Sequence, residues 1–270
     1  MKTRLLVTIV PLLALLCAAV LEPHWLSVAR VQFAHPDVPA SFDGVRIAFL
    51  TDIHHGPGFS QARVRHAVDV ANCLHPDIVL LGGDYVFVDA RFVPGCFQEL
   101  SRLQAPLGRY GVLGNHDHWN GAVLVSESMV EAGIAWVNNR GEWLEIGQQR
   151  IRIGGVDDLW EGSQDLPSAL GDARRQDLVI LLSHNPDYVE RLDTDLVDLV
   201  FSGHTHGGQV TLFGKWAPLV PSEYGQKYRT GVVRTERTTV VISNGVGTIT
   251  PELRLFCRPQ IILLELRRAE

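Results

Sequence analysis

The residues His204 and His206, separated by one position, have the types and spacing of a metal-binding pair. They lie in the stretch 201–209, which follows the apolar run 196–200 and contains three glycines. At the end of a buried strand and among small residues, two imidazoles can turn toward one point and bind an ion. A His-x-His pair alone is weak evidence, because such pairs also occur in ordinary loops. Whether this pair binds a metal ion therefore depends on the polar residues at the other strand ends.

Four other apolar runs also end in polar side chains. In open α/β sheets, ligands bind at the carboxyl ends of strands, so we expect these side chains to converge on one site. The cluster offers about twice the donors that one divalent ion needs, which predicts two ions. Carboxylate, amide and imidazole donors favour Mn, Fe or Zn over Ca and Mg, and the missing thiolates argue against a structural zinc site. These side chains belong to Asp52, His54, Asp84, Asn115, His116 and His184.

Alternating strands and helices must position these residues from position 43 onward. The segment 45–84 is a predicted βαβ unit with parallel strands, in which Ser60 caps the helix. Residues 134–153 form predicted antiparallel strands that begin a second sheet. Further strands are expected at 110–113, 177–182, 196–201, 209–213, 239–243 and 260–266, and further helices at 96–103 and 121–132.

Composition and charge limit the classes of protein and partner. The 270 residues are 46% hydrophobic and 20% charged, which is enough for one sizeable core. The net charge is −6 without a basic block after the N-terminus, so nucleic acid is not an expected partner. Of the four cysteines, Cys17 lies in the apolar N-terminal stretch, and the other three have no metal-ligand spacing and are predicted to be small buried hydrophobes: Cys73, Cys96 and Cys257. The oligomeric state stays open.

The N-terminal segment 1–22 has the pattern of a signal anchor or signal peptide. Lys2 and Arg4 precede the apolar stretch 5–21, and no clean small-residue cleavage pattern follows, so we favour an uncleaved anchor. The charge distribution places the catalytic part on the extracytoplasmic side of an inner or cytoplasmic membrane. The alternative is a cytosolic protein with a buried N-terminal helix. We expect residues 23–42 to be a linker and residues 43–270 to form the catalytic domain.

Five sequence blocks, taken in order, resemble the motifs of the calcineurin-like metallophosphoesterases. More narrowly, the stretches 81–86, 183–187, 203–209 and 255–259 are similar to the YkuE/YaeI-type phosphodiesterases. The resemblance spans residues 43–266. The five blocks are Asp52-x-His54, Gly83-Asp84, Gly114-Asn115-His116-Asp117, His184 and Gly203-His204-Thr205-His206.

This resemblance implies a four-layer α/β/β/α sandwich with a dinuclear site at one end, preceded by the N-terminal hydrophobic helix. It implies that His116 stabilises or protonates the leaving oxygen and that Asp117 holds the ring of His116. Two cations about 3.5 to 4 Å apart would polarise the phosphoryl group and supply a bridging hydroxide. The implied ligands are Asp52, His54, Asp84 and His206 for the first ion, and Asp84, Asn115, His184 and His204 for the second, with Asp84 bridging.

The leading function is metal-dependent hydrolysis of a phosphodiester. The alternative is a membrane-associated UDP-2,3-diacylglucosamine pyrophosphohydrolase of lipid A synthesis. A membrane anchor and the apolar residues within 216–228 would suit its lipid-linked substrate. A protein phosphatase is disfavoured, because no Asp-Arg-Gly pattern follows Asp84. A non-catalytic scaffold on the same fold would have lost ligands, and none is missing.

Six further residues near the motifs have roles that the sequence leaves open. For the two histidines among them, contact with substrate and an ordinary surface position are equally good explanations. The two aspartates follow a predicted strand. The arginines could pair with a phosphate, although solvated arginines are commoner. These residues are His55, His118, Asp157, Asp158, Arg254 and Arg258.

Overall fold

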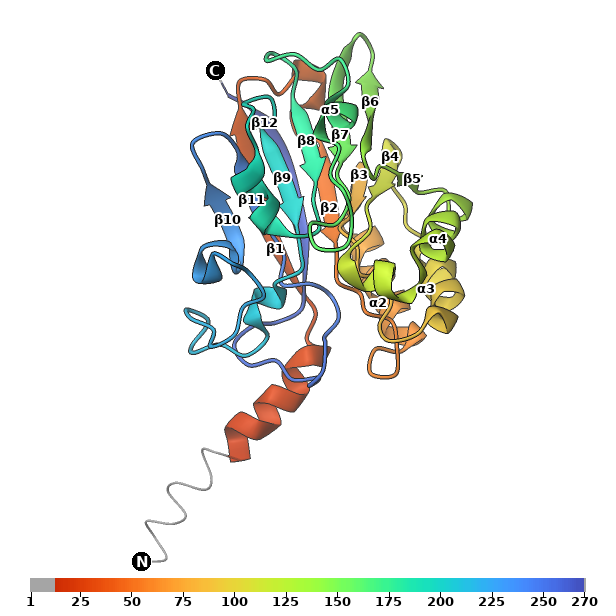
Figure 1. Cartoon of the computed structure of the whole chain (residues 1–270), viewed down its shortest axis with the longest axis vertical. Coiled ribbons are helices and arrows are strands. Elements are labelled where there is room, and N and C mark those ends of the chain that lie inside the picture. Colours follow the sequence, from red (N-terminus) through yellow and green to blue (C-terminus); the bar gives the residue numbers. More distant parts are fainter. Residues whose placement is uncertain (1–12, 270) are drawn as a thin grey trace, which may run out of the picture.

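The first of two six-stranded sheets has the strand order β1-β12-β2-β3-β4-β5 in the computed structural model, which describes residues 13–269 (Figure 1). Strands β2 to β5 are parallel, β12 is antiparallel to β2, and β1 is parallel to β12. The strands are β1 (Ser27–His35), β12 (Gln260–Arg268), β2 (Arg46–Leu50), β3 (Ile78–Leu81), β4 (Gly108–Gly111) and β5 (Ala135–Trp136).

The second sheet has the order β10-β11-β9-β8-β7-β6. Its central strands β11, β9, β8 and β7 are parallel, and an antiparallel strand closes each edge. Strands β8 and β9 are entirely buried and, except for Ser202, apolar, as expected for parallel strands that are covered on both faces. The strands are β10 (Gly231–Arg234), β11 (Thr239–Ile242), β9 (Leu199–Ser202), β8 (Val179–Leu182), β7 (Gln149–Gly155) and β6 (Arg140–Ile146).

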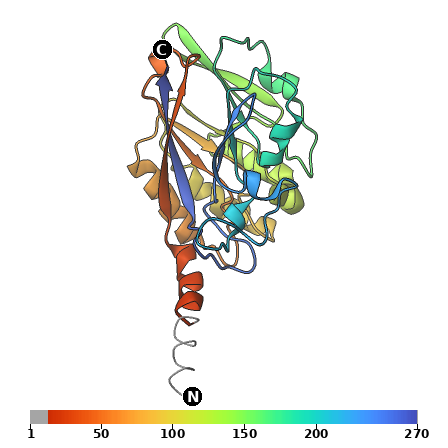
Figure 2. The same cartoon turned by 90° about the vertical axis from the view of Figure 1, so that its left-hand side faces the viewer.

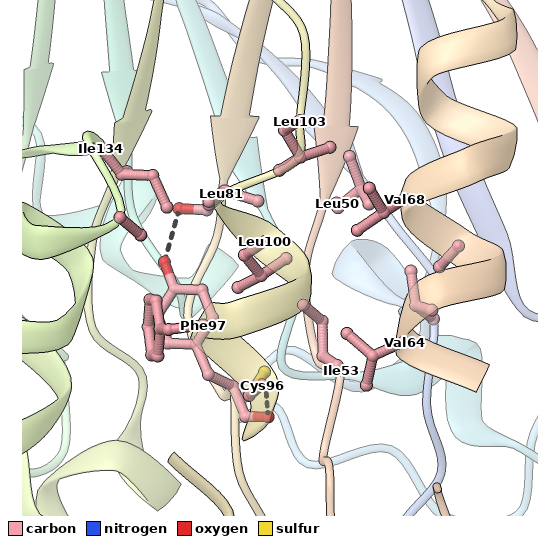
Figure 3. Close-up of a cluster of buried hydrophobic side chains, with 14 of the residues drawn as sticks. Leu50, Ile53, Val64, Val68, Leu81, Cys96, Phe97, Leu100, Leu103 and Ile134 are labelled. Atoms are coloured by element: carbon pink, nitrogen blue, oxygen red, sulfur yellow. Dashed lines mark hydrogen bonds between the residues drawn. The ribbon is translucent and has the colours of Figure 1, made fainter. Parts of the chain in front are cut away.

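Helices cover the outer faces of the two sheets. The helices α2 (Gln61–Cys73), α3 (Val93–Leu100) and α4 (Asn115–Glu131) lie against the first sheet. Figure 3 shows Val68 of α2 beside Leu50 and Val64 beside Ile53. The second sheet packs against α5 (Leu166–Leu170) and the 3-10 helix η4 (Pro186–Arg191). The remaining 3-10 helices are η1 (Glu22–His24), η2 (Ala40–Phe42), η3 (Ala90–Phe92), η5 (His206–Gly208) and η6 (Gly225–Tyr228).

A central core joins the two sheets face to face. Phe49 of β2 and Phe201 of β9 are fully buried there, with ring centroids 5.1 Å apart. Both residues lie shortly before polar residues of the predicted site, so the packing that joins the sheets also brings their strand ends together. The expected α/β fold with two sheets is confirmed.

Several predicted elements differ in the structure. Residues 23–42 are no linker, because β1 pairs with β12 along its whole length. Residues 209–213 form only isolated bridges, from Val210 to Leu255 and from Leu212 to Trp216, because their apolar side chains largely face outward instead of into a sheet. Strand β5 lies in the range 134–153, which was expected to begin the second sheet, but it belongs to the first. Cys73 is exposed, although it was expected to be buried.

Residues 13–21 are helical and project from the body of the molecule (Figure 1, Figure 2). Most of their side chains are exposed, which argues against a buried N-terminal helix. Within the range 13–269, no helix is both long enough and apolar enough to cross a membrane. The predicted anchor at 1–22 lies partly outside the described residues.

Candidate metal centre

All seven predicted ligands follow strands that end at the same edge of the molecule. Each side chain is at most 5% exposed, so the two sheets and their loops enclose a polar cluster. The parallel direction of β2, β3 and β4, and of β8 and β9, places their carboxyl ends together. Asp52 and His54 follow β2, Asp84 follows β3, Asn115 follows β4, His184 follows β8, and His204 and His206 follow β9.

One half of the cluster gathers two imidazoles and two carboxylates. The Nε2 atoms of His54 and His206 are 3.0 Å apart, and Nε2 of His206 is 3.3 Å from Oδ1 of Asp52. The Nε2 atom of His54 is also 3.6 Å from Oδ2 of Asp84. These four side chains therefore direct their donor atoms toward a common point.

The other half shares Asp84 with the first. The Nε2 atom of His184 is 3.2 Å from Oδ2 of Asp84, the same oxygen that faces His54. Nearby, Nδ1 of His204 is 3.1 Å from Oδ1 of Asn115. The carboxylate of Asp84 thus lies between two groups of donors.

The loops that carry these ligands adopt backbone conformations that L-residues rarely take. A positive φ occurs at five ligands, and such strain is typical of functional sites. Close approach also requires glycine at Gly203, where an added Cβ would lie 2.1 Å from Oδ2 of Asp52. The five ligands with positive φ are Asp52, His54, Asp84, His204 and His206.

Hydrogen bonds from neighbouring groups fix the carboxylates. The backbone N–H of His204 donates to both oxygens of Asp52, at 3.0 and 3.1 Å, and the Thr51 hydroxyl donates to Oδ2 at 2.8 Å. The backbone N–H of His116 donates to Oδ1 of Asp84 at 2.8 Å. These bonds leave Oδ2 of Asp84 free to face both halves of the cluster.

Burial and neighbouring charges set the protonation of the cluster. Burial lowers the pKa of both His54 and His204 to about 3, which leaves these imidazoles neutral, as metal ligands must be. Burial alone would raise the pKa of Asp84, but His184 and His54 outweigh it and hold that pKa below the ordinary value. Burial raises the pKa of Asp52 to about 6.

The residues present fit a pair of divalent ions. Within the described part of the chain, Nε2 of His204 is buried and has no hydrogen-bond partner. His184 has its other ring nitrogen 2.8 Å from the carbonyl oxygen of Gly82, which orients Nε2 toward Asp84. Leaving the buried Nε2 of His204 without a partner costs free energy, which a bound cation would offset.

His116 lies at the rim of the cluster and is half-buried. Its ring centroid is 4.8 Å from that of His54 and 4.5 Å from that of Trp119, so it reaches both the ligands and an exposed side chain. Burial lowers the pKa of His116. This position suits contact with a substrate oxygen.

Asp117 has a different role from the expected one, in which it holds the ring of His116. Its carboxylate accepts the backbone N–H groups of Asp84 at 2.7 Å, Gly114 at 2.9 Å and Tyr85 at 2.9 Å. It therefore joins the start of α4 to the loop that carries Asp84. Asp117 supports the position of Asp84 through backbone hydrogen bonds instead of contacting the ring of His116.

The six residues whose roles the sequence left open differ in burial and in their contacts. Arg254 is fully buried behind His206, whereas Arg258 is exposed and lies over the Trp25 ring. His118 contacts Asp157, with 2.9 Å between Nε2 and Oδ1. Two remaining residues are buried: His55, whose Nδ1 is 2.7 Å from the carbonyl oxygen of Phe59, and Asp158, whose Oδ1 accepts the backbone N–H groups of Trp160 and Glu161.

Sequence reasoning missed two aromatic residues at the site. The exposed Trp160 meets the ring of His204 edge-on at 4.2 Å, and the exposed Trp119 does the same to His116 at 4.5 Å. The only signal in the sequence is their closeness to the motifs, because Trp119 follows the Asn115 block and Trp160 follows Asp158.

The fold and the cluster define a metallophosphoesterase. Residues 45–208 match the calcineurin-like phosphoesterase family, so the chain belongs to that family, and the predicted enzyme class is confirmed. The chain is 32% identical to the phosphodiesterase YaeI of Escherichia coli, over 91% of this chain and 90% of that protein. It is 30% identical to the metallophosphoesterase YkuE of Bacillus subtilis, over 93% of this chain and 88% of that protein.

Solved structures extend the similarity of fold beyond detectable sequence similarity. NAD nucleotidase of Haemophilus influenzae superposes on 75% of this chain with a TM-score of 0.52 and 13% identity. The matched region is 50% of that longer chain. At this identity the match concerns the fold alone.

Proposed function

We propose that this protein hydrolyses phosphodiesters at a dinuclear metal centre. The observation that carries this proposal is the sharing of Asp84 Oδ2 by two donor groups, at 3.6 Å from His54 and 3.2 Å from His184. A carboxylate in that place suits a bridge between two ions. The first ion would be held by Asp52, His54, Asp84 and His206, and the second by Asp84, Asn115, His184 and His204.

Divalent ions held by these residues, of Mn, Zn or Fe, would supply Lewis-acid polarisation of the phosphoryl group and activation of water near neutral pH. The chain positions the reactants around them. His116 is placed to donate a proton to the leaving oxygen, since its half-buried ring faces both the cluster and the exterior. Asp117 keeps Asp84 in place through backbone hydrogen bonds.

Two variants test these roles through separate measurements. We expect His116→Ala to lower the turnover of bis(p-nitrophenyl) phosphate while the metal content stays near that of the wild type. Asp84→Ala should lose metal and activity together. His66→Ala is the matched control, because His66 is an exposed histidine on α2. Full activity in either of the first two variants would overturn the assignment, as would a loss of metal in the control.

A substrate panel separates the leading function from its alternatives. Simple phosphodiesters, phosphomonoesters and UDP-2,3-diacylglucosamine, each supplied with Mn or Zn, distinguish a phosphodiesterase from the pyrophosphohydrolase of lipid A synthesis. Retention of all seven ligands argues against a non-catalytic scaffold. The absence of both bound metal and hydrolysis would favour that scaffold.

We further propose that residues 1–22 anchor the protein to a membrane, with the catalytic domain on the extracytoplasmic side. Support comes from the basic residues before the apolar stretch 5–21 and from the exposed Leu13, Leu16, Val20 and Leu21 on the projecting helix. Protease treatment of intact and opened cells tests the orientation. Digestion of the catalytic domain only after the inner membrane is opened would contradict it.

A further inference from the structure

A second exposed apolar surface lies in the loop that follows the ligand His206. In the loop 210–219, Phe213 is 71% and Leu219 is 77% exposed, and Lys215 is the only charged residue. We define the apolar loop surface as the exposed side chains of Leu212, Phe213, Trp216 and Leu219, together with Phe256.

Backbone hydrogen bonds hold this loop in an ordered shape. The N–H of Leu212 donates to the carbonyl of Trp216 at 2.7 Å, and the N–H of Thr211 donates to that of Leu255 at 2.9 Å. The rings of Phe213 and Phe256 pack at 5.4 Å. The apolar side chains are therefore presented outward by a fixed backbone.

The segment 254–257 connects the apolar loop surface to the N-terminal helix. The N–H of Arg254 donates to the carbonyl of Ala19 at 3.0 Å, and the N–H of Phe256 donates to Oε2 of Glu22 at 2.8 Å. Because Leu255 pairs with the loop, the exposed apolar helix and the apolar loop surface lie beside each other.

Both features lie at the end of the molecule that holds the metal centre. Strand β1 starts soon after the helix and runs parallel to β12, which is antiparallel to β2. The start of β1 is therefore next to the carboxyl end of β2, which leads to Asp52. Figures 1 and 2 show the helix projecting from this end of the sheets.

We propose that the apolar loop surface inserts into the interface of a lipid bilayer beside the N-terminal helix and holds the metal-centre end of the molecule against the membrane. A bilayer is the favoured occupant because the chain extends beyond the helix by the mainly apolar segment 1–12, which begins with Lys2 and Arg4. Leucine, phenylalanine and tryptophan with a single lysine are typical of interfacial membrane contact.

This inference rests on the proposed membrane anchor and is independent of the proposed hydrolysis. A helix anchor alone would hold the domain to the membrane at a single point. Contact at a second surface, next to the helix, fixes which end faces the lipid. The metal centre would then act on phosphoesters at the membrane surface.

Tryptophan quenching tests the insertion of the loop. The full chain is reconstituted into phosphatidylcholine vesicles with and without dibrominated acyl chains, which quench tryptophans that enter the bilayer. Trp216, in the loop, and Trp25, shortly after the helix, are both exposed, so Trp216→Phe should clearly reduce the quenched emission. The control Trp143→Phe, on the edge strand β6, should remove none.

A polar triple variant tests the surface as a whole. Leu212→Ser, Phe213→Ser and Leu219→Ser together should abolish quenching of Trp216 while the anchored chain stays with the vesicles. The matched control replaces the exposed residues Val123, Leu124 and Val130 of α4 by serine and should quench as the wild type does. Hydrolysis of bis(p-nitrophenyl) phosphate in detergent verifies the fold and tests the proposed function separately.

Three results would overturn the inference. Equal quenching in the wild type and in Trp216→Phe would show that the loop stays in water. A change from dimer to monomer in the triple variant, with vesicle quenching unaltered, would assign the surface to a second copy of the chain. A wild type that does not sediment with vesicles would refute the anchor as well.

Discussion

Replacement of Arg254 by methionine should destabilise the protein and weaken metal binding at the same time. The buried guanidinium donates to the carbonyl oxygens of Cys257 at 3.0 Å, Asn244 at 2.6 Å and Gly247 at 2.6 Å, and its Nη2 is 3.5 Å from Nδ1 of His206. It thus ties the segment 244–257 to His206, a proposed metal ligand. A methionine fills similar space without any donor.

The magnitude follows from the carbonyl groups that lose a charged donor, which are the three above and that of His206 at 3.4 Å. Each such bond contributes about 1.5–3 kcal/mol, and relief from burying a cation offsets part of the loss, so we expect the free energy of unfolding to fall by about 3–5 kcal/mol. Loss of support behind a metal ligand typically costs about 10–100-fold in metal affinity. Arg254→Lys keeps the charge and should lie between the wild type and Arg254→Met.

Urea unfolding of the metal-free protein measures the first effect, and metal titration measures the second. Both should shift together. If Arg254→Met unfolded at the wild-type urea concentration and bound metal normally while turnover fell, the arginine would contact substrate, and our reasoning about the loop would be refuted.

Two other substitutions test the core and the electrostatics. Phe201→Ala should lower the free energy of unfolding by about 3–5 kcal/mol in urea titration, because the ring packs on Phe49 between the sheets; a loss below about 1 kcal/mol would contradict this packing. Burial raises the pKa of Asp198 from 3.8 to about 7, so the folded chain keeps a proton that the unfolded chain releases, and stability falls as pH rises through this window. Asp198→Asn keeps an acceptor for the N–H of Val179 and should remove this loss of stability, which reaches about 4 kcal/mol by pH 8. The melting temperature measured against pH tests this, and a profile unchanged by the substitution would contradict the role of Asp198.

The sequence predicted the site better than it predicted the edges of the fold. The ligands follow short, wholly apolar runs such as β3 and β8, and the parallel direction of such strands brings their ends together. The apolar pattern of β1 is less distinct, because Arg30 and Gln32 interrupt it. Its partner strand β12 lies at the opposite end of the chain. Pairing between such distant segments leaves no local signal.

The roles of single polar residues depended on contacts that the sequence does not encode locally. Asp117 was assigned to the ring of His116 by resemblance, but its acceptors face backbone N–H groups, which every residue type carries. The burial of Arg254 left no local signal in the sequence, because its partners are carbonyl groups at four separate positions. At 209–213 the apolar pattern indicated a strand, whereas the side chains of Leu212 and Phe213 face outward.

The number of divalent ions bound per chain tests the central claim most directly. Elemental analysis and calorimetric titration of the purified protein should give two ions per chain, with phosphodiester hydrolysis rising only as the second ion binds. Asp84→Asn should bind fewer ions and lose that activity, since its side chain faces both donor groups. A wild type that is fully active with one ion per chain, or with none, would contradict the account.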